Sequence, residues 1–442
     1  MTAKIPIAET PLDAAPLRFR QVLVLVLALL LAALDGYDAL SMAFVAPALA
    51  AEWGIGKSVL GLLLSSSLVG MAIGAIVLSP LADRVGRRAV VLGALALLVL
   101  GTTLSGLSST VPILIGARLV TGTGIGVMVA MTTLLSAEFA NAKRRALAVA
   151  MVATLGFPLG GVLGGLGASA ILKAATWHWV FFAGSIIGMA ILALAAIVLP
   201  ESPVFLIVRR SSDALERANR VLASLGHVPM SELPAVVERP DTRYRALFGA
   251  GASVIILRLT AIAILISTAS YYILNWMPQL VVDAGFTPAQ GSLASAQSGM
   301  IGFLGGVVFA VFASRFRATR VAAVAMIGAA IALSAVGLVP PVLKLMVLAG
   351  GLLSFCLAGT TGMMYTILAT AFPPGLRASG MGFVMGVMRI ASALGPALAG
   401  VMFANGMTRA SVSLIFAIGP LVASVLVMTL PSSAHSSPGR PD

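Results

Sequence analysis

Two carboxylates lie three residues apart in the first long apolar stretch of the chain, in the sequence Asp35-Gly36-Tyr37-Asp38. Residues at positions i and i+3 of a helix share one face, so the two acids would lie side by side. An ionisable group inside a membrane helix is expensive and is retained where it faces a bundle interior or an aqueous path. The pair therefore predicts a proton-coupling site formed by Asp35 and Asp38.

Two arginines are expected at a similar depth. A rise of 1.5 Å per residue puts Arg118 about 10 Å from the outer end of the fourth apolar stretch, which matches Asp35 in a core about 30 Å thick. An ion pair of Arg118 with either acid is reasonable. Arg389 is expected about 15 Å from the cytoplasmic end of the eleventh stretch. The apolar stretches of the second half contain no acid, so Arg389 is predicted to bind a substrate carboxylate. The alternatives are a structural ion pair for Arg118, and carbonyls with water for Arg389.

Aromatic and amide side chains near these charges are further candidates for contacts with the substrate. Tyr37 and Tyr271 could stack on an aromatic ring. Trp276 is expected nearer the outer interface, where aromatic belts are ordinary. Asn275 and Gln297 are candidate polar contacts. No histidine falls at the middle of an apolar stretch, so the carboxylates must carry the protons.

The elements that position these residues are long apolar runs. Of the 442 residues, 59% are hydrophobic and 10% are charged, which is typical of a polytopic membrane protein. Runs of about 20 residues, enough to cross a bilayer as a helix, occur twelve times. The expected fold class is an all-α polytopic membrane protein with twelve transmembrane helices. In chain order the spans are 22–46, 58–80, 89–108, 111–136, 146–171, 177–199, 256–278, 288–313, 319–338, 342–368, 379–404 and 410–430.

The distribution of charge predicts the topology. The net charge of +13 comes from Lys and Arg that gather in alternate loops, which is the positive-inside pattern and argues against a nucleic-acid partner. Both termini are therefore expected in the cytoplasm, in a bacterial inner membrane. The first sixteen residues lack the pattern of a signal peptide, so we expect a cytoplasmic tail there. Cys356 is the one cysteine, which excludes disulfides within the chain.

One long polar segment divides the chain into two halves of six spans. We expect an N-terminal half over residues 1–200, a cytoplasmic linker over 201–248 and a C-terminal half over 249–442. Halves of this kind are parallel repeats, each built from inverted three-helix units, with the substrate site near the midplane between them. Within the linker, residues 212–225 suit an amphipathic surface helix, and the alternative is a solvated linker in contact with the membrane surface.

The segment Ser79-Pro-Leu-Ala-Asp83-Arg84-Val-Gly86-Arg87-Arg88 resembles the loop signature of the major facilitator superfamily. Gly86 allows a tight turn in such a loop. The resemblance implies that Asp83 lies at the N-terminus of the eleventh helix, near Ser379, where the helix dipole favours a carboxylate and the contact holds the outward-open state. The family's leading glycine is Ser79 here. Three arginines are predicted to anchor the loop at anionic headgroups, namely Arg84, Arg87 and Arg88.

A narrower resemblance covers nearly the whole chain. The segments 35–38, 138–145, 200–203, 272–278 and 372–396 are similar to those of the aromatic acid:proton symporter family. The family implies proton-linked roles for the two acids of the first segment and substrate or coupling roles for the two deep arginines. Val204 departs from the family pattern, which affects gating more than substrate class. The remaining gating residues that the resemblance implies are Glu138, Arg144, Arg145 and Arg377.

The predicted function is a proton-coupled secondary transporter that imports a small organic anion, most simply an aromatic carboxylate, by alternating access. One alternative is a proton-coupled exporter of the same fold, although the sequence Gly156-Phe-Pro158 matches the antiporter signature poorly. Another is a membrane sensor that transports nothing. No Walker loop, metal-ligand cluster or nucleophile with a placed base occurs, so neither an enzyme nor a cofactor is expected. The expected partners are the anion, protons and lipid, with the protein acting as a monomer.

Overall fold

The computed structural model describes residues 11–234, 252–313, 315–372 and 377–430, which are helical with short connections. Twelve helices in these ranges are long and apolar enough to span a membrane, so the predicted fold class is confirmed. The first half contains α1 (Pro11–Ala14), α2 (Phe19–Trp53), α3 (Lys57–Ile73), a π-helical turn η1 (Gly74–Leu78), a 3₁₀ turn η2 (Ser79–Leu81), α4 (Ala82–Val85), α5 (Arg87–Gly106), α6 (Val111–Phe139), α7 (Ala142–Ala174) and α8 (His178–Val198).

The described parts of the linker and of the second half are also helical. The linker contributes α9 (Pro203–Arg209) and α10 (Ala214–Ser224), and part of the expected linker, residues 235–248, lies outside the described residues. The second half contains α12 (Ala252–Asp283), α13 (Pro288–Ala313), α14 (Ala318–Leu338), α15 (Leu343–Ala371), α16 (Arg377–Ser392), α17 (Leu394–Ala404) and α18 (Arg409–Met428).

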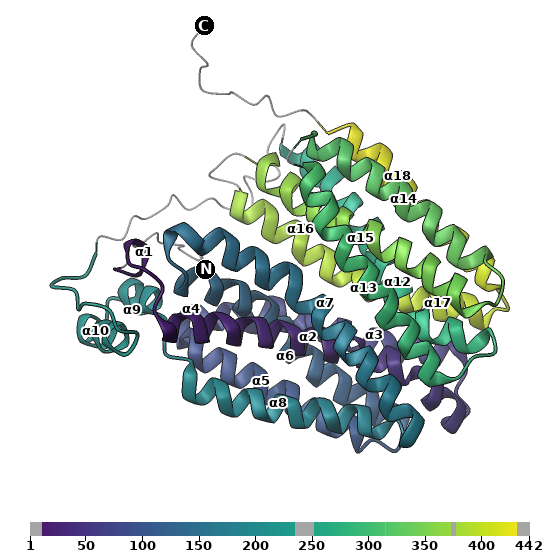
Figure 1. Cartoon of the computed structure of the whole chain (residues 1–442), viewed down its shortest axis with the longest axis horizontal. Helices are drawn as coiled ribbons and strands as arrows, with labels where there is room; N and C mark the ends of the chain where they lie inside the picture. Colours follow the sequence, from purple (N-terminus) through teal and green to yellow (C-terminus); the bar gives the residue numbers. More distant parts are fainter. Residues whose placement is uncertain (1–10, 235–251, 314, 373–376, 431–442) are drawn as a thin grey trace, which may run out of the picture.

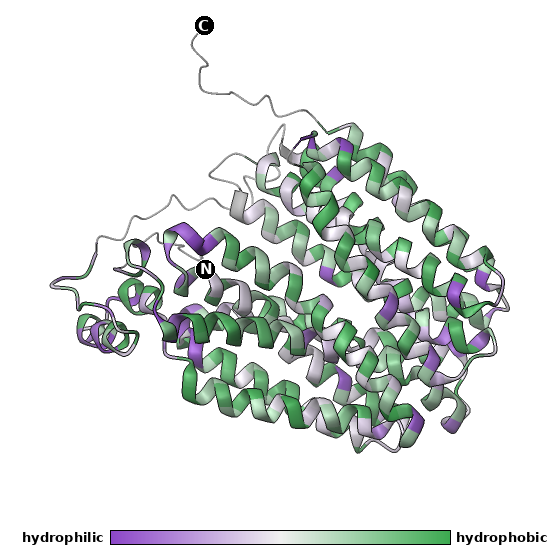
Figure 2. Ribbon diagram, in the orientation of Figure 1, coloured by the Kyte–Doolittle hydropathy of each residue, from purple (hydrophilic) through white to green (hydrophobic). Residues whose placement is uncertain are grey.

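The two halves lie side by side in Figure 1, with α2 to α8 in purple and blue and α12 to α18 in green and yellow. Helices α9 and α10 lie beyond one end of the bundle, which we call the linker end, and we call the opposite end the far end. Figure 2 shows the long helices mainly in the green of hydrophobic residues, with purple gathered around α9 and α10. This apolar surface is what a lipid environment requires of helices whose backbone bonds are satisfied internally.

The eleventh span is a broken helix. α16 ends at Ser392, and α17 begins two residues later, because Pro396 has no N–H to donate and its ring would clash with the carbonyl four residues earlier. Side chains of other helices donate to carbonyls around the break: Ser65 donates to the carbonyl of Ala393 at 2.8 Å, and Trp276 donates to that of Pro396 at 3.1 Å. The break places Arg389 one turn before a discontinuity, as is common at transporter binding sites.

Hydrogen bonds, an ion pair and apolar packing join the two halves toward the far end. Lys57 and Asp283 pair there at 2.6 Å, and Ser292 of α13 donates to the carbonyl of Phe44 at 3.2 Å. One buried apolar cluster at that end contains residues of both halves, including Phe44 and Tyr272. Toward the linker end, most of the buried apolar residues fall into two separate clusters, one for each half. The packing therefore closes the bundle at the far end.

The position of Asp283 corrects one expectation. The seventh span was expected to end at residue 278, and the second half was expected to hold no acid in its spans. Helix α12 instead continues to Asp283, because the last turn is stabilised by a bond from Gln279 to that carboxylate at 2.8 Å. Asp283 lies at the far end and pairs with Lys57, so it does not serve Arg389.

The described part of the linker packs on the first half. The amphipathic helix expected over 212–225 is observed as α10, whose residues Ala214, Ala218 and Leu222 are buried against protein. Behind it, His227 is hydrogen-bonded through Nε2 to Gln21 at 2.8 Å. Burial, together with the charge of Arg18, lowers the pKa of His227, so this side chain is neutral at pH 7. The linker is thus joined to α2 by this neutral contact and by a bond from Arg20 to the carbonyl of Ser224 at 2.8 Å.

Candidate substrate and proton site

The two acids of α2 are buried in the interior of the first half. Asp35 is 2% exposed and Asp38 is 0% exposed. Their oxygens Asp35 Oδ1 and Asp38 Oδ2 have no hydrogen-bond partner among the described residues. The close approach of α7 deepens this burial, because a side chain at Gly36 would meet the carbonyl oxygen of Phe157 at 2.1 Å. Burying an ionised carboxylate without full hydrogen bonding is costly, so these two acids stand out from the apolar packing around them.

Arg118 lies at the predicted depth beside Asp38, but the contact differs from the prediction. Arg118 Nη2 donates to the main-chain carbonyl of Asp38 at 2.6 Å, whereas an ion pair with a carboxylate was expected. The guanidinium carbon lies 5.5 Å from the ring centre of Phe181 on α8, which holds the side chain from the other side. Arg118 is 0% exposed, and its Nε and Nη1 have no partner in the described part of the chain. It is a buried neighbour of the acids.

Thr102 of α5 is a member of this cluster that the sequence analysis missed. Its hydroxyl donates to Asp38 Oδ1 at 2.9 Å. A threonine in an apolar helix carries no signal in the sequence, because most threonines at such positions bond to their own helix. Only the packing of α5 against its neighbours reveals the contact.

Arg389 has a more open environment in the second half. Its Nη1 donates to the hydroxyl of Tyr271 at 3.4 Å, and the side chain is partly exposed. Tyr365 of α15, which the sequence analysis also missed, interacts electrostatically with Arg389 and is 43% exposed. Across the two halves, Arg389 also interacts electrostatically with Asp35. The predicted proton site and the predicted anion site are therefore within electrostatic reach of each other.

A small apolar cavity of about 30 Å³ lies near this arginine. Side chains of α12, α15 and α16 line it, and Tyr365 belongs both to its wall and to the group around Arg389. An arginine beside apolar and aromatic side chains suits a ligand that combines a carboxylate with a ring. The cavity is lined by Ala263, Ile266, Thr361, Met364, Tyr365, Leu368, Val384, Met385 and Met388.

The other predicted contact residues occupy varied positions. Tyr37 is packed inside the first half and donates to the carbonyl of Val180 at 2.5 Å, so it lies away from Arg389. Asn275 is buried, donates to the carbonyl of Tyr271 at 2.9 Å, and leaves its Oδ1 without a partner among the described residues. Gln297 is exposed on α13. Of these three, Asn275 is the one attached to the arginine cluster.

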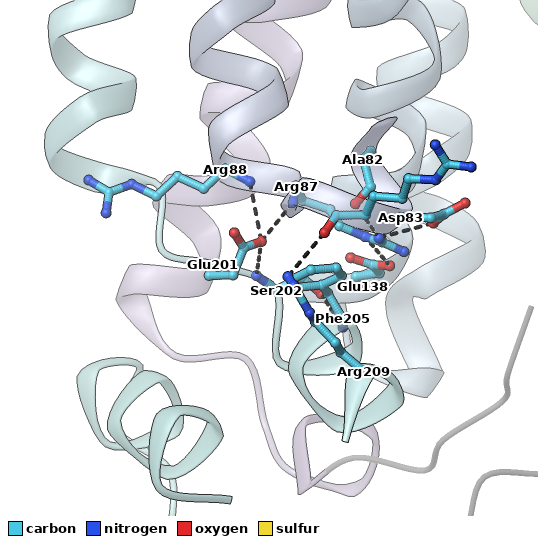
Figure 3. Close-up of polar contacts among 10 residues, drawn as sticks. Ala82, Asp83, Arg87, Arg88, Glu138, Glu201, Ser202, Phe205 and Arg209 are labelled. Carbon is cyan, nitrogen blue, oxygen red and sulfur yellow. Dashed lines mark hydrogen bonds and ion pairs between the residues drawn. The ribbon is translucent and has the colours of Figure 1, made fainter. Parts of the chain in front are cut away.

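The loop at the linker end of α3 forms a network of charges, shown in Figure 3. Arg87 pairs with Asp83 at 3.0 Å and with Glu138 at 3.4 Å. Glu201, which follows α8, accepts from the main-chain N–H groups of Arg87 at 2.7 Å and of Arg88 at 3.2 Å. The carboxylate of Glu201 thus caps the N-terminus of α5, where the helix dipole favours a negative charge.

Gly86 forms the tight turn of this loop, as predicted. Its φ of 115° lies in the region that favours glycine, and a side chain there would meet Glu201 Oε2 at 2.3 Å. Asp83 was expected to face the eleventh helix. In this structure it is 54% exposed and bonds within its own loop to Arg87. This arrangement fits a bundle that is closed at the far end.

The remaining basic residues bind around the same end. Arg84 accepts through its carbonyl from Arg209 at 3.0 Å, and Arg88 donates to the carbonyl of Ala196 at 2.7 Å. Glu138 was expected to act with its neighbouring basic loop, but it pairs with Arg87 of α5, because α5 and α6 pack directly. Arg145 instead pairs with Asp13 of α1, and the main-chain N–H of Arg144 donates to Asn141 at 3.1 Å. Arg377 begins α16.

Comparisons with known proteins agree with this architecture. The family described as Major Facilitator Superfamily matches residues 25–315 and 259–442. A 4-hydroxybenzoate transporter PcaK of Pseudomonas putida is 31% identical over 86% of this chain and 86% of its own length. A gallate transporter of the same organism is 27% identical over 96% of this chain and 94% of its own length. The inward-open xylose transporter XylE of E. coli has the same fold, with a TM-score of 0.74, 17% identity, and coverage of 94% of this chain and 98% of that chain.

Proposed function

The chain belongs to the major facilitator superfamily, among its aromatic acid transporters, and we propose that it imports a small aromatic carboxylate together with a proton. The observation that carries the proposal is the interaction of Asp35 with Arg389 across the two halves. Transport by alternating access needs a site that both halves share. A buried acid facing a partly exposed arginine supplies a proton acceptor and an anion receptor at one place.

The coupling follows from these charges. A substrate carboxylate that pairs with Arg389 neutralises the cation that Asp35 otherwise faces. Anion binding at Arg389 and proton binding at Asp35 then favour each other, and by linkage the effect is reciprocal. With both sites neutralised, the charge that must pass through the closed intermediate is smaller. Asp38 and Arg118 form the adjoining, deeper part of the same proton site.

The aromatic side chains beside Arg389 support a ring-bearing substrate. Tyr271 and Tyr365 offer aromatic faces and hydroxyls beside the guanidinium. Rings that pack on aromatic side chains gain more than area burial alone. In our proposal the carboxylate binds Arg389, and the ring lies toward these two tyrosines. Asn275, which is bonded to Tyr271, is the candidate contact for a ring hydroxyl.

Gating at the linker end is part of the proposal. We propose that the Asp83 carboxylate leaves Arg87 and binds the N-terminus of α16 when the linker end closes. The carboxylate is half exposed, and its present partner Arg87 lies in the same loop, so little holds it in place. Glu138 and the basic residues around it would then hold the first half rigid in both states. Residues 1–200 and 249–442 are the two moving bodies in this account.

The orientation rests on the basic residues of the linker end. Arg209, Arg210, Arg217 and Arg220 gather on α9, on α10 and between them, which by the positive-inside rule supports a cytoplasmic linker end and a bacterial inner membrane. One chain contains the whole site, so we propose that the monomer transports.

The test uses purified protein in liposomes and two probe acids, 4-hydroxybenzoate and gallate. With the outside acidic, we expect uptake above equilibrium, and a protonophore should abolish it. The double variant Asp35→Asn with Asp38→Asn should lose the response, whereas Asp213→Asn, on the exposed linker, should keep it. Equal uptake with and without a proton gradient would contradict proton coupling. If neither these acids nor benzoate is carried, the substrate class is wrong.

A further inference from the structure

Thr102 uses its hydroxyl differently from its neighbours on α5. Thr103 bonds to the carbonyl of Val99 at 2.7 Å, and Ser105 bonds to that of Gly101 at 2.8 Å, which is the usual pattern for hydroxyls in a helix. The hydroxyl of Thr102 instead leaves its helix and donates to Asp38 Oδ1 of α2 at 2.9 Å. Thr102 is 0% exposed, so water does not compete for this bond.

The surroundings of Asp38 make this bond important. Among the described residues, Thr102 is the donor to the carboxylate, because Arg118 and Ser41 both donate to the main-chain carbonyl of Asp38 instead. The charged and titratable groups within electrostatic reach are Arg118 from α6, and Asp35 and Tyr37 from the same helix. The other carboxylate oxygen has no partner in the described part of the chain.

We propose that Thr102 is a positioning residue for proton coupling, which holds the Asp38 carboxylate through its hydroxyl in both protonation states. A hydroxyl can donate and accept. It donates to the ionised carboxylate, and it can accept a hydrogen bond from the protonated carboxyl oxygen once Asp38 is protonated, so the bond reverses without movement of the side chain. This inference rests on the proposed proton-coupled function, and it adds a residue that sets the pH at which the proton loads.

The experiment compares Thr102→Val with Thr102→Ser in liposomes. Valine keeps the shape and removes the hydroxyl, so the ionised acid loses its donor. We expect the midpoint of the pH profile of 4-hydroxybenzoate or gallate uptake to move toward alkaline pH by about one unit. Serine should restore the midpoint of the wild type. Thr103→Val is the matched control, because it removes a hydroxyl that contacts Ser185 of α8 instead of a carboxylate, and it should leave the midpoint unchanged.

A second readout separates this inference from the proposed function. Infrared titration of the protonated carboxyl band needs no substrate, and the contribution of Asp38 is identified by its loss in Asp38→Asn. That band should shift in Thr102→Val and return in Thr102→Ser. An unchanged band and an unchanged uptake midpoint in Thr102→Val would overturn the role of Thr102. If wild-type uptake itself ignores pH, the proposed function fails, and the infrared result alone decides the inference.

Discussion

The two halves hold their deep arginines in opposite ways. Arg118 of the first half is 0% exposed and is fixed between the carbonyl of Asp38 and the ring of Phe181. Arg389 of the second half is partly exposed and has one long bond to Tyr271 at 3.4 Å. A packed arginine stabilises its neighbours, whereas a loosely held one is available to a ligand. This difference is in line with the proposed division of roles, in which the first half binds the proton and the second half binds the anion.

The same contrast extends to the helices that hold these residues. α2 and α7 pack so closely that a side chain at Gly160 would meet the carbonyl oxygen of Ala33 at 1.7 Å. α16 is broken at Ser392, and side chains at Gly382 and Gly386 would meet open space. α2, which contains both acids, is therefore tightly packed, whereas α16, which contains Arg389, has room to adjust when a substrate binds.

The largest effect should distinguish the two arginines. Arg389→Ala should lose nearly all binding of the probe acid, by 2 to 5 kcal/mol or about 30-fold or more, because the charge that receives the carboxylate is gone. Its fold should be intact, because the side chain is loosely held. Arg118→Ala should instead lower the unfolding temperature, because a buried group loses its partner, at a cost of about 3 to 5 kcal/mol. Equilibrium binding and thermal unfolding in detergent measure the two effects.

The distinction between the two arginines would be wrong if Arg118→Ala lost binding and Arg389→Ala lost stability. Wild-type affinity in Arg389→Ala would make this arginine structural, and the anion would have to be held elsewhere. Arg118 would be the next residue to test. Arg258→Ala, at the linker end of α12 and bonded to the carbonyl of Thr429, serves as a matched control in the same half and should bind normally.

A second prediction concerns the acids. Asp35→Asn and Asp38→Asn should each abolish uphill accumulation, because a neutral amide cannot carry the proton. Exchange of labelled for unlabelled substrate should persist in at least one of them, because the anion receptor in the second half is untouched. Accumulation and exchange are measured on the same liposomes. Normal proton-driven uptake in both variants would remove the proton role from the first half.

A third prediction, with a smaller expected effect, concerns how Arg389 binds the anion. Arg389→Lys keeps the charge but loses the planar fork of donors, so binding should weaken by about 1 to 3 kcal/mol, the worth of a charged hydrogen bond. Isothermal calorimetry with the probe acid measures this change. Arg258→Lys should bind as the wild type does. An unchanged affinity in Arg389→Lys would show that charge alone, and no bidentate contact, holds the anion.

The sequence by itself determined the fold class, because a span is defined by local apolar length. Each of the twelve expected spans overlaps an observed helix, and the span over 288–313 coincides with α13 (Pro288–Ala313). It also identified Asp35, Asp38, Arg118 and Arg389, since a charge inside an apolar run stands out without any knowledge of packing. The turn at Gly86 followed from the same local reasoning.

Only the tertiary structure decided the partners of these groups. The contact of Arg118 with a carbonyl, the pairing of Glu138 with Arg87, and the bond from Thr102 to Asp38 each join helices that are distant in the chain. Which atoms meet depends on how those helices rotate and cross, and that is set by packing summed over many residues. The sequence shows which residues carry charge and how deep they lie. Their partners follow from the packed bundle alone, because a hydrogen bond requires atoms within about 3 Å, and helix spacing along the chain does not specify position that finely.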